Sequence, residues 1–237
     1  AGIFITHGHA DSIGALPYIL RKYDIPVFGS QLSIELAKIE VQRENKHRKN
    51  SLFHVIDADT EIDFKNASIS FFHTTHSIPD SLGIDVHTPE GEIVYTGDFK
   101  FDPTAAKNYH TDMDRLAEIE HRGVLALLSD SSNAEASFPN ASEQDIGNFV
   151  TNVFRNAKGR IIVAAKASNL NRVQEVLNAA KATGKRVLLT GRDLAKIVRT
   201  SMKLGYLDVP DGLLMRVKDL KTVPNNKTVI LETGRMG

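Results

Sequence analysis

The stretch Thr6-His7-Gly8-His9-Ala10-Asp11-Ser12 places two histidines two positions apart and a carboxylate two positions further on. It follows the apolar run Gly2-Ile3-Phe4-Ile5 and precedes a helix-like segment, residues 13–20. This order predicts that the three side chains stand at the end of a strand, where they can face a common centre. Imidazole nitrogens and carboxylate oxygens are ligands of zinc and manganese. The alternative is a polar turn in which Asp11 or Ser12 caps the helix.

The composition limits the kinds of site that the chain can build. It has 237 residues, of which 41% are hydrophobic and 24% charged, and it has no cysteine. Disulfides and thiolate zinc sites are therefore excluded, and a metal site must use His, Asp and Glu. The lack of cysteine is compatible with a cytoplasmic protein. The formal net charge of zero does not indicate a uniformly basic nucleic-acid-binding protein, although a local basic groove remains possible.

The pattern of the chain changes near residue 135. Between residues 52 and 99 it predicts short strands, and an apolar strand follows at 124–128. Beyond residue 141 it predicts helices at 142–157, 169–183 and 193–204, alternating with strands at 160–165, 186–190 and 228–231. Such alternation is typical of a parallel α/β unit. We therefore expect two domains, residues 1–135 and 136–237, and no apolar run reaches the roughly 20 residues of a membrane span.

Five metal-ligating side chains follow predicted strands of the first domain: His7, His9, Asp11, His76 and Asp98. If one sheet edge gathers their loops, the five side chains converge. Taken singly, His76 is equally compatible with an ordinary loop histidine, and Asp98 with a turn residue after Thr-Gly. Their occurrence together favours a metal centre.

Four longer strings resemble one known family. They are His-Gly-His-Ala-Asp-Ser-Ile-Gly-Ala-Leu-Pro-Tyr, Thr-His-Ser-Ile-Pro-Asp-Ser-Leu-Gly, Thr-Gly-Asp-Phe-Lys-Phe-Asp and Ser-Asp-Ser-Ser-Asn-Ala-Glu. Together they resemble bacterial ribonuclease J, in the β-CASP branch of the metallo-β-lactamase superfamily. The resemblance implies an α/β fold, a partial metallo-β-lactamase αββα sandwich with an inserted parallel α/β β-CASP domain. It also implies that the chain is the middle of a longer protein.

The resemblance assigns roles to these residues. It implies two divalent metal ions, zinc or manganese, with the first held by His7, His9 and His76. Asp98 would bridge both ions, and Asp11 would bind the second and orient the attacking water. Asp11, His76 and Asp98 are thus the expected catalytic residues.

Other family positions lie after the first domain's last strand and in the second domain. Asp130 would contact a ligand histidine, not the metal, and would fix the orientation of that histidine. The alternative is that it is only a turn aspartate. Ser168, Asn169 and Asn171 stand at the start of a predicted helix, where they would contact the RNA phosphate. Helix capping is the alternative role for Ser168 and Asn169.

Two positions depart from the family's active pattern. Ser12 replaces a histidine that would bind the second metal, and a hydroxyl is a much weaker ligand than imidazole. Asn171 replaces a histidine at the phosphate, and Asn carries no charge. A third departure, Arg235 in Thr-Gly-Arg-Met-Gly, could contact phosphate or lie on the surface, and the basic stretch 42–50 is a further candidate for RNA contact. The first metal site is complete in sequence and the second is doubtful.

The expected function is a metal-dependent ribonuclease acting 5′ to 3′ on RNA with a 5′-monophosphate, with endonuclease activity possible and with weak activity overall. The alternative is an inactive RNA-binding subunit. Some bacteria encode two ribonuclease J paralogues, of which the second has a degenerate site, and the loss of two histidines makes this sequence resemble that second paralogue. That role implies a homo-oligomer or a hetero-complex with an active ribonuclease J. A different superfamily reaction, such as thioester or lactam hydrolysis, is disfavoured by the segments around Asp130 and Asn169.

Overall fold

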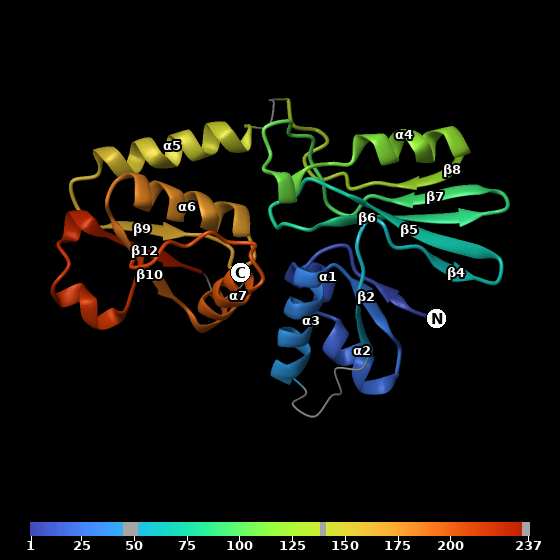
Figure 1. The fold of residues 1–237 in the computed structure, drawn as a ribbon, viewed down its shortest axis with the longest axis horizontal. Coiled ribbons are helices and arrows are strands. Elements are labelled where there is room, and N and C mark those ends of the chain that lie inside the picture. The colour runs from blue at the N-terminus through green and yellow to red at the C-terminus, as the bar shows by residue number, and fades with distance from the viewer. Residues whose placement is uncertain (45–51, 138–140, 234–237) are drawn as a thin grey trace. The chain divides into compact units, whose positions relative to one another are not determined.

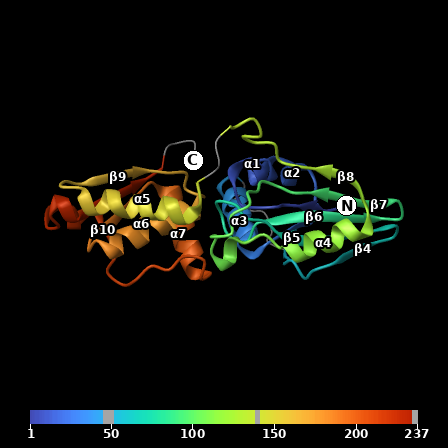
Figure 2. The same ribbon diagram turned by 90° about the horizontal axis from the view of Figure 1, so that it is seen from above.

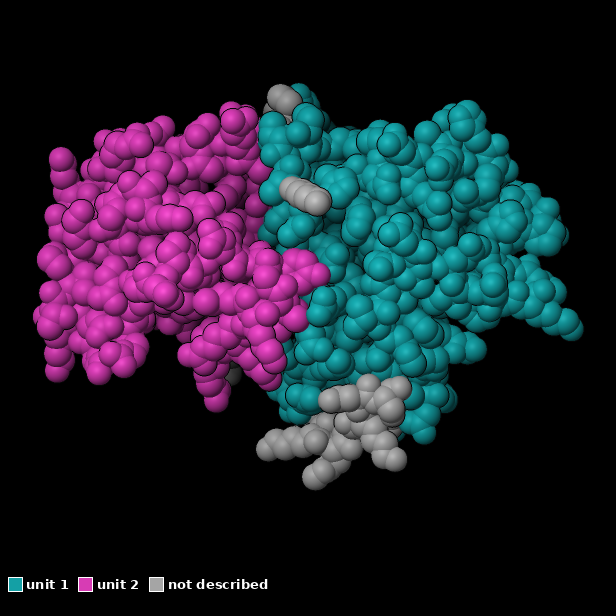
Figure 3. All heavy atoms as spheres, viewed as in Figure 1, with its two compact units in different colours: residues 1–139 teal, residues 140–237 magenta. Residues whose placement is uncertain are grey.

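The computed structural model describes residues 1–44, 52–137 and 141–233. Most of the basic stretch 42–50, and Arg235, lie outside these ranges. The chain divides into two compact units, unit 1 at Ala1–Pro139 and unit 2 at Asn140–Gly237, which Figure 3 colours separately.

Unit 1 begins with a three-stranded parallel sheet in the order β1-β2-β3. The strands are β1 (Ile3–Phe4), β2 (Val27–Gly29) and β3 (Phe53–Val55), and the helices between them are α1 (Ala10–Ile13), α2 (Leu16–Lys22) and α3 (Gln31–Glu44). The sequence predicted one helix over 13–20, whereas the chain forms two short ones. Gly14 ends α1 by donating its N–H to the carbonyl of Ala10, and Pro17 lies in the first turn of α2, where proline is tolerated.

The second sheet of unit 1 has five strands in the order β4-β5-β6-β7-β8. They are β4 (Ile62–Phe64), β5 (Ala67–His73), β6 (Leu82–Thr88), β7 (Gly91–Tyr95) and β8 (Val124–Leu128). All neighbours are antiparallel except β7 and β8, which are parallel and connected through helix α4 (Met113–Arg122). The sequence pattern did not predict α4, which begins where the Asp112 side chain accepts a hydrogen bond from the Arg115 N–H. Strand β8 is apolar but exposed, since it is outermost among the described strands.

The two sheets of unit 1 pack face to face with helices outside them (Figures 1 and 2). Phe4 of β1 meets Phe71 of β5 between the sheets, with ring centroids 6.0 Å apart. On the other face of β5, Phe72 packs with Ile119 of α4. Because alternate residues of a strand face opposite sides, Phe71 and Phe72 hold together an αββα order of layers.

Unit 2 is a four-stranded sheet in the order β11-β10-β12-β9, and every neighbouring pair is parallel. The strands are β9 (Ile161–Ala164), β10 (Arg186–Thr190), β11 (Leu214–Met215) and β12 (Thr228–Glu232), and the helices are α5 (Glu143–Asn156), α6 (Leu170–Ala182) and α7 (Arg192–Lys203). Ser142 and Asn169 cap α5 and α6 through their side chains. No described helix in either unit is long and apolar enough to cross a membrane.

A buried ion network joins α4 to the second sheet of unit 1. Asp85 of β6 and Glu92 of β7 are both fully buried. Arg122 contacts both, with its Nη2 atom 2.7 Å from Asp85 Oδ2 and its Nε atom 2.5 Å from Glu92 Oε1. Burial, and then repulsion by Glu92, raises the pKa of the Asp85 carboxyl, while Arg122 opposes the rise. The single positive charge of the Arg122 guanidinium therefore stabilises the negative charges of both buried carboxylates.

We expect Arg122→Met to lower the free energy of unfolding by about 2–4 kcal/mol at neutral pH, because it leaves two buried carboxylates without a cation. The loss should shrink as the pH falls to about 4 and below, because protonation of the buried carboxyls, of which Asp85 has a raised pKa, removes the negative charges that Arg122 offsets. Urea unfolding at several pH values measures this. Arg115→Met is the matched control on α4, because Arg115 pairs with the exposed Glu118. Equal losses in the two variants would contradict the proposed compensation.

Candidate metal centre

Three histidines of unit 1 form a compact cluster. His7 and His9 follow β1, and His76 follows β5. Their ring centroids are 4.7–4.8 Å apart, and one ring nitrogen from each lies within 4.8 Å of the others. The closest pair is His76 Nε2 and His9 Nδ1 at 3.1 Å. The histidine cluster thus joins residues nearly seventy positions apart in sequence.

Backbone hydrogen bonds hold the loops that carry the cluster. The Leu82 N–H donates to the Thr6 carbonyl at 2.9 Å, which connects the end of β1 to the start of β6. The Lys100 N–H donates to the Thr75 carbonyl at 2.9 Å, which connects the loop of Asp98 to that of His76. Gly97 has φ +60°, and a Cβ there would lie 3.0 Å from Thr6 Cβ. Only glycine permits both this backbone conformation and this close approach.

Two histidines of the cluster, His7 and His76, are held in the neutral form that binds metals. Burial lowers the pKa of His76 to about 3, with further contributions from the neighbouring His9 and His7. Burial also lowers the pKa of His7, although Asp98 and Asp11 oppose that shift. Neutral imidazole offers a nitrogen lone pair to a cation, whereas imidazolium does not. The cluster is therefore prepared to bind a metal at neutral pH.

The donor set and its spacing fit a divalent metal. Zinc–nitrogen bonds of about 2.0–2.1 Å in a tetrahedron place two ligand nitrogens about 3.3 Å apart. The 3.1 Å between the nitrogens of His9 and His76 is close to this value. The carboxylate of Asp98 lies 3.8 Å from Nε2 of both His7 and His76. The cluster and Asp98 together provide three nitrogens and one oxygen.

A second group of possible ligands shares His7. It consists of His7, Asp11 and Asp98, whose ligand atoms also lie within 4.8 Å of one another. Asp11 is exposed in the first turn of α1, and the Asp98 side chain is 40% exposed. The hydroxyl of Ser12 lies 3.4 Å from both ring nitrogens of His7. All five predicted ligands therefore meet in one place, with Ser12 beside them.

Asp130 lies in the loop after β8, close to the centre. Its Oδ1 atom accepts a hydrogen bond from the Ser132 N–H at 2.8 Å, and its own N–H donates to Thr96 Oγ1 at 3.1 Å. Hydrogen bonds from the Ser132 backbone and side chain, and then from the Phe99 backbone, lower the pKa of Asp130, with a smaller contribution from His76. Among the described residues the carboxylate acts on His76 through its charge rather than through a direct bond.

The predicted phosphate residues belong to unit 2. Ser168 lies in the turn before α6, and the Asn169 side chain accepts a hydrogen bond from the Arg172 N–H at 2.9 Å. Asn169 is thus a helix cap, as the alternative interpretation expected. Asn171 lies in the first turn of α6 and is partly exposed.

Two side chains that support the cluster were not identified from the sequence. Thr6 Oγ1 lies 2.9 Å from His7 Nδ1, and Ser77 Oγ lies 3.3 Å from His9 Nε2. Hydroxyls in such positions fix the orientation of a ligand ring. Thr6 directly precedes His7 and Ser77 directly follows His76, so their adjacency to ligands was the available signal.

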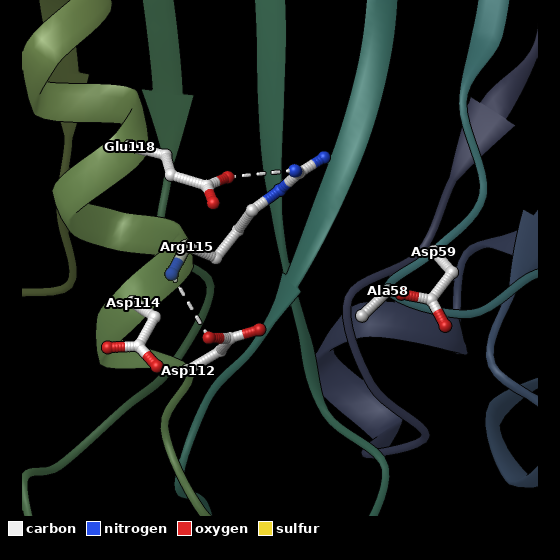
Figure 4. A pocket seen from close by; sticks show the side chains of 6 residues that line it. All are labelled: Ala58, Asp59, Asp112, Asp114, Arg115 and Glu118. Atoms are coloured by element: carbon white, nitrogen blue, oxygen red, sulfur yellow. Dashed lines mark hydrogen bonds and ion pairs between the residues drawn. The ribbon is translucent and has the colours of Figure 1, made fainter.

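A separate pocket of unit 1 contains none of the predicted site residues (Figure 4). It is lined by Ala58, Asp59, Asp112, Asp114, Arg115 and Glu118. In it, Arg115 Nη1 donates to Glu118 Oε2 at 3.0 Å. Four carboxylates with one guanidinium disfavour a phosphate ligand, so this pocket does not extend the candidate centre.

Comparison with known proteins agrees with this geometry. Residues 2–135 match the model of the metallo-beta-lactamase superfamily, and residues 158–237 match that of the ribonuclease J beta-CASP domain. These matches confirm the predicted fold class.

Individual relatives are similar along the whole chain. The chain is 54% identical over 237 residues to a Streptococcus pyogenes protein named Ribonuclease J 2, covering 100% of this chain and 43% of that protein. It is 43% identical over 236 residues to proteins of the same name from Staphylococcus epidermidis and Staphylococcus aureus, covering 100% of this chain and 42% of each. The chain thus spans less than half the length of these relatives.

A crystal structure of an Enterococcus faecalis protein of unknown function has the same fold, with a TM-score of 0.64 and 17% identity over 98% of this chain and 58% of that one. The family matches and the relatives together lead to one assignment. This chain belongs to the metallo-beta-lactamase superfamily.

Proposed function

We propose that the chain forms the nuclease core of a metal-dependent ribonuclease that degrades RNA from a 5′-monophosphate end in the 5′ to 3′ direction. Internal cleavage is its proposed secondary activity, and the cytoplasm its proposed location. The observation that supports this function best is the histidine cluster, in which three imidazole nitrogens lie within 4.8 Å of one another. Residues 1–135 would form the metallo-β-lactamase domain and residues 136–237 the β-CASP domain.

In unit 1, some side chains would hold the metal ion, and others would orient the attacking water or the histidine rings. His7, His9 and His76 would hold one zinc or manganese ion, and Asp98 would add a carboxylate to it. Such an ion stabilises negative charge on a phosphate and makes water more acidic. Asp11, on the exposed side of the centre, would accept a hydrogen bond from the attacking water and orient it. Thr6 and Ser77 would keep the histidine rings aligned.

The proposed activity is weak because the second site is incomplete. Ser12 lies against His7, at 3.4 Å, where an imidazole would be needed as a ligand. The second group therefore has two carboxylates and the shared His7. In unit 2, Ser168, Asn169 and Asn171 are proposed to bind the phosphate without a positive charge, which makes that contact weaker than a histidine's.

A second candidate function is a non-catalytic RNA-binding subunit that assembles with an active ribonuclease J or with itself. Ser12 and Asn171 support it, because each stands where the family's active pattern has a histidine, and both histidines would serve the same reaction. The similarity to proteins named Ribonuclease J 2 is consistent with this role. The following experiments separate the two candidates.

Metal binding tests the histidine cluster directly. We expect His76→Ala to weaken zinc or manganese binding by at least about 100-fold. Substituting a residue that only orients a metal ligand already lowers metal affinity by about 10–100-fold. Metal content after dialysis and titration calorimetry of the full-length protein measure it. His121→Ala is the control, because His121 is exposed at the end of α4. Unaltered binding in His76→Ala would contradict the assignment of the cluster.

Cleavage tests the nuclease role. Full-length protein with manganese should shorten 5′-monophosphorylated RNA from its 5′ end, and His76→Ala or Asp98→Asn should lower the rate by about 100-fold or more. The control is again His121→Ala. No cleavage even at high protein concentration would reject the nuclease. In that case Asp98→Asn should keep both partner binding and cellular function, as the subunit role requires.

Restoration tests whether the site is degenerate only at the two substituted positions. The double variant Ser12→His, Asn171→His should raise the number of bound metal ions and increase cleavage by about 10-fold or more, since ligand positions control both. The single variants show which position contributes. No gain in either quantity would mean that other residues also limit the reaction.

A further inference from the structure

The parallel sheet of unit 2 has two edges with different side chains. The carboxyl end of β9 leads to Ser168 and Asn169. At the opposite edge the strands begin, and the helices before them end. We call this second edge the basic edge and define it by Lys158, Arg160, Lys181, Lys185 and Lys227. Because all four strands are parallel, these cations from separate loops lie at the same edge.

Three of the five cations, Arg160, Lys185 and Lys227, meet at the 3-10 turn Asn225–Lys227. Arg160 Nη2 donates to Asn225 Oδ1 at 2.6 Å, and Lys185 Nζ donates to the Asn226 carbonyl at 2.5 Å. The amine of Lys227 lies 3.5 Å from the position that a Cβ atom would take at Gly184. One turn therefore collects positive charges from the loops before β9, β10 and β12.

Two of these charges, on Lys185 and Lys227, repel each other. Lys185 is only 7% exposed, and burial, followed by repulsion from Lys227, lowers its pKa. Across the described residues, Lys158, Lys181 and Lys227 are exposed and make no ion pair. Asp219, a carboxylate near the edge, already pairs with Arg186 at 3.6 Å. The fold thus keeps Lys185 and Lys227 close to each other despite their repulsion.

Helix stabilisation explains only part of this cluster. Lys181 lies in the last turn of α6, where a cation interacts favourably with the helix dipole. Lys158, Lys185 and Lys227 are not in α-helices, and the last two repel each other. Binding of an anion would remove that repulsion.

We propose that the basic edge binds the sugar-phosphate backbone of RNA, outside the nuclease site. RNA is favoured over an acidic protein because residues 158–237, which include the whole basic edge, match the ribonuclease J beta-CASP domain, and because regularly spaced phosphates suit cations presented by neighbouring loops. The five side chains include no aromatic residue for base stacking, so recognition is independent of sequence. The proposal rests on the ribonuclease function but concerns binding, which is measured without cleavage.

Strand length sets the size of RNA that the edge affects. Strands of 4–5 residues at about 3.3 Å per residue separate the two edges of the sheet by about 15 Å. At about 3.4 Å per stacked nucleotide, an RNA of about 30 nucleotides is far longer than this separation, whereas a fragment of about four nucleotides, about 14 Å long, falls short of it. Long RNA should therefore depend on these lysines more than short RNA.

The test uses the full-length protein in EDTA and the triple variant Lys158→Gln, Lys181→Gln, Lys227→Gln. Fluorescence anisotropy with a single-stranded RNA of about 30 nucleotides should show at least about a fivefold rise in Kd at about 50 mM salt, with the salt slope reduced by up to about 2. The control variant Lys22→Gln, Lys65→Gln, Lys196→Gln removes the same charge from other exposed positions. Its Kd should change less than about twofold.

Several results would overturn the proposal. One is an unchanged Kd and salt slope in the triple variant, with thermal unfolding showing that it is folded. Another is an equal loss in the control, which would reflect net charge alone. A third is unchanged RNA binding with lost binding of polyglutamate, which would assign the surface to an acidic protein. Unaltered cleavage of a four-nucleotide RNA, together with weakened binding of long RNA, would support a surface separate from the nuclease site.

Discussion

The candidate centre depends on two loops of different sheets being held together by backbone hydrogen bonds. The bond from Leu82 to Thr6 joins the loop of His7 and His9 to the five-stranded sheet, and the bond from Lys100 to Thr75 brings Asp98 to the loop of His76. Backbone groups provide this attachment without using the side chains needed for chemistry. Burial then keeps the rings of His7 and His76 neutral. Position and protonation of these ligands therefore follow from the packing of one sheet on the other.

The same geometry explains how one substitution could weaken one proposed metal site without affecting the other. In the proposed centre the three imidazoles would form a donor set without Ser12, so the absence of a histidine at that position would leave the first site intact. The second group relies on His7, Asp11 and Asp98, and the hydroxyl of Ser12 is a poor replacement for a fourth, nitrogen ligand. A protein with this arrangement can keep a metal for structure or weak catalysis. Our proposals for a weak nuclease and for a subunit share this physical starting point.

Much of the fold was predictable because its signals are local. The side-chain caps of α5 and α6, and the glycines that follow α6 and α7, define the alternating pattern of unit 2. Predictions failed where local signals are weak. Helix α4 has a polar face that dominates its sequence, and its place is decided by Ile119 packing on Phe72 and by Arg122 binding Asp85 and Glu92. Those partners are thirty or more positions away.

By itself, the sequence determined the kinds of ligand available, their family resemblance and the two substituted positions, because residue identity and short spacing carry that information. Only the tertiary structure decided that His76 stands 3.1 Å from His9, that Thr6 and Ser77 contact the ligand rings, and that Ser12 lies against His7. It also decided that cations from three loops meet at Asn225–Lys227. The reason is that strand pairing and the packing of sheets bring distant loops together, and no local pattern in the chain records which loops meet.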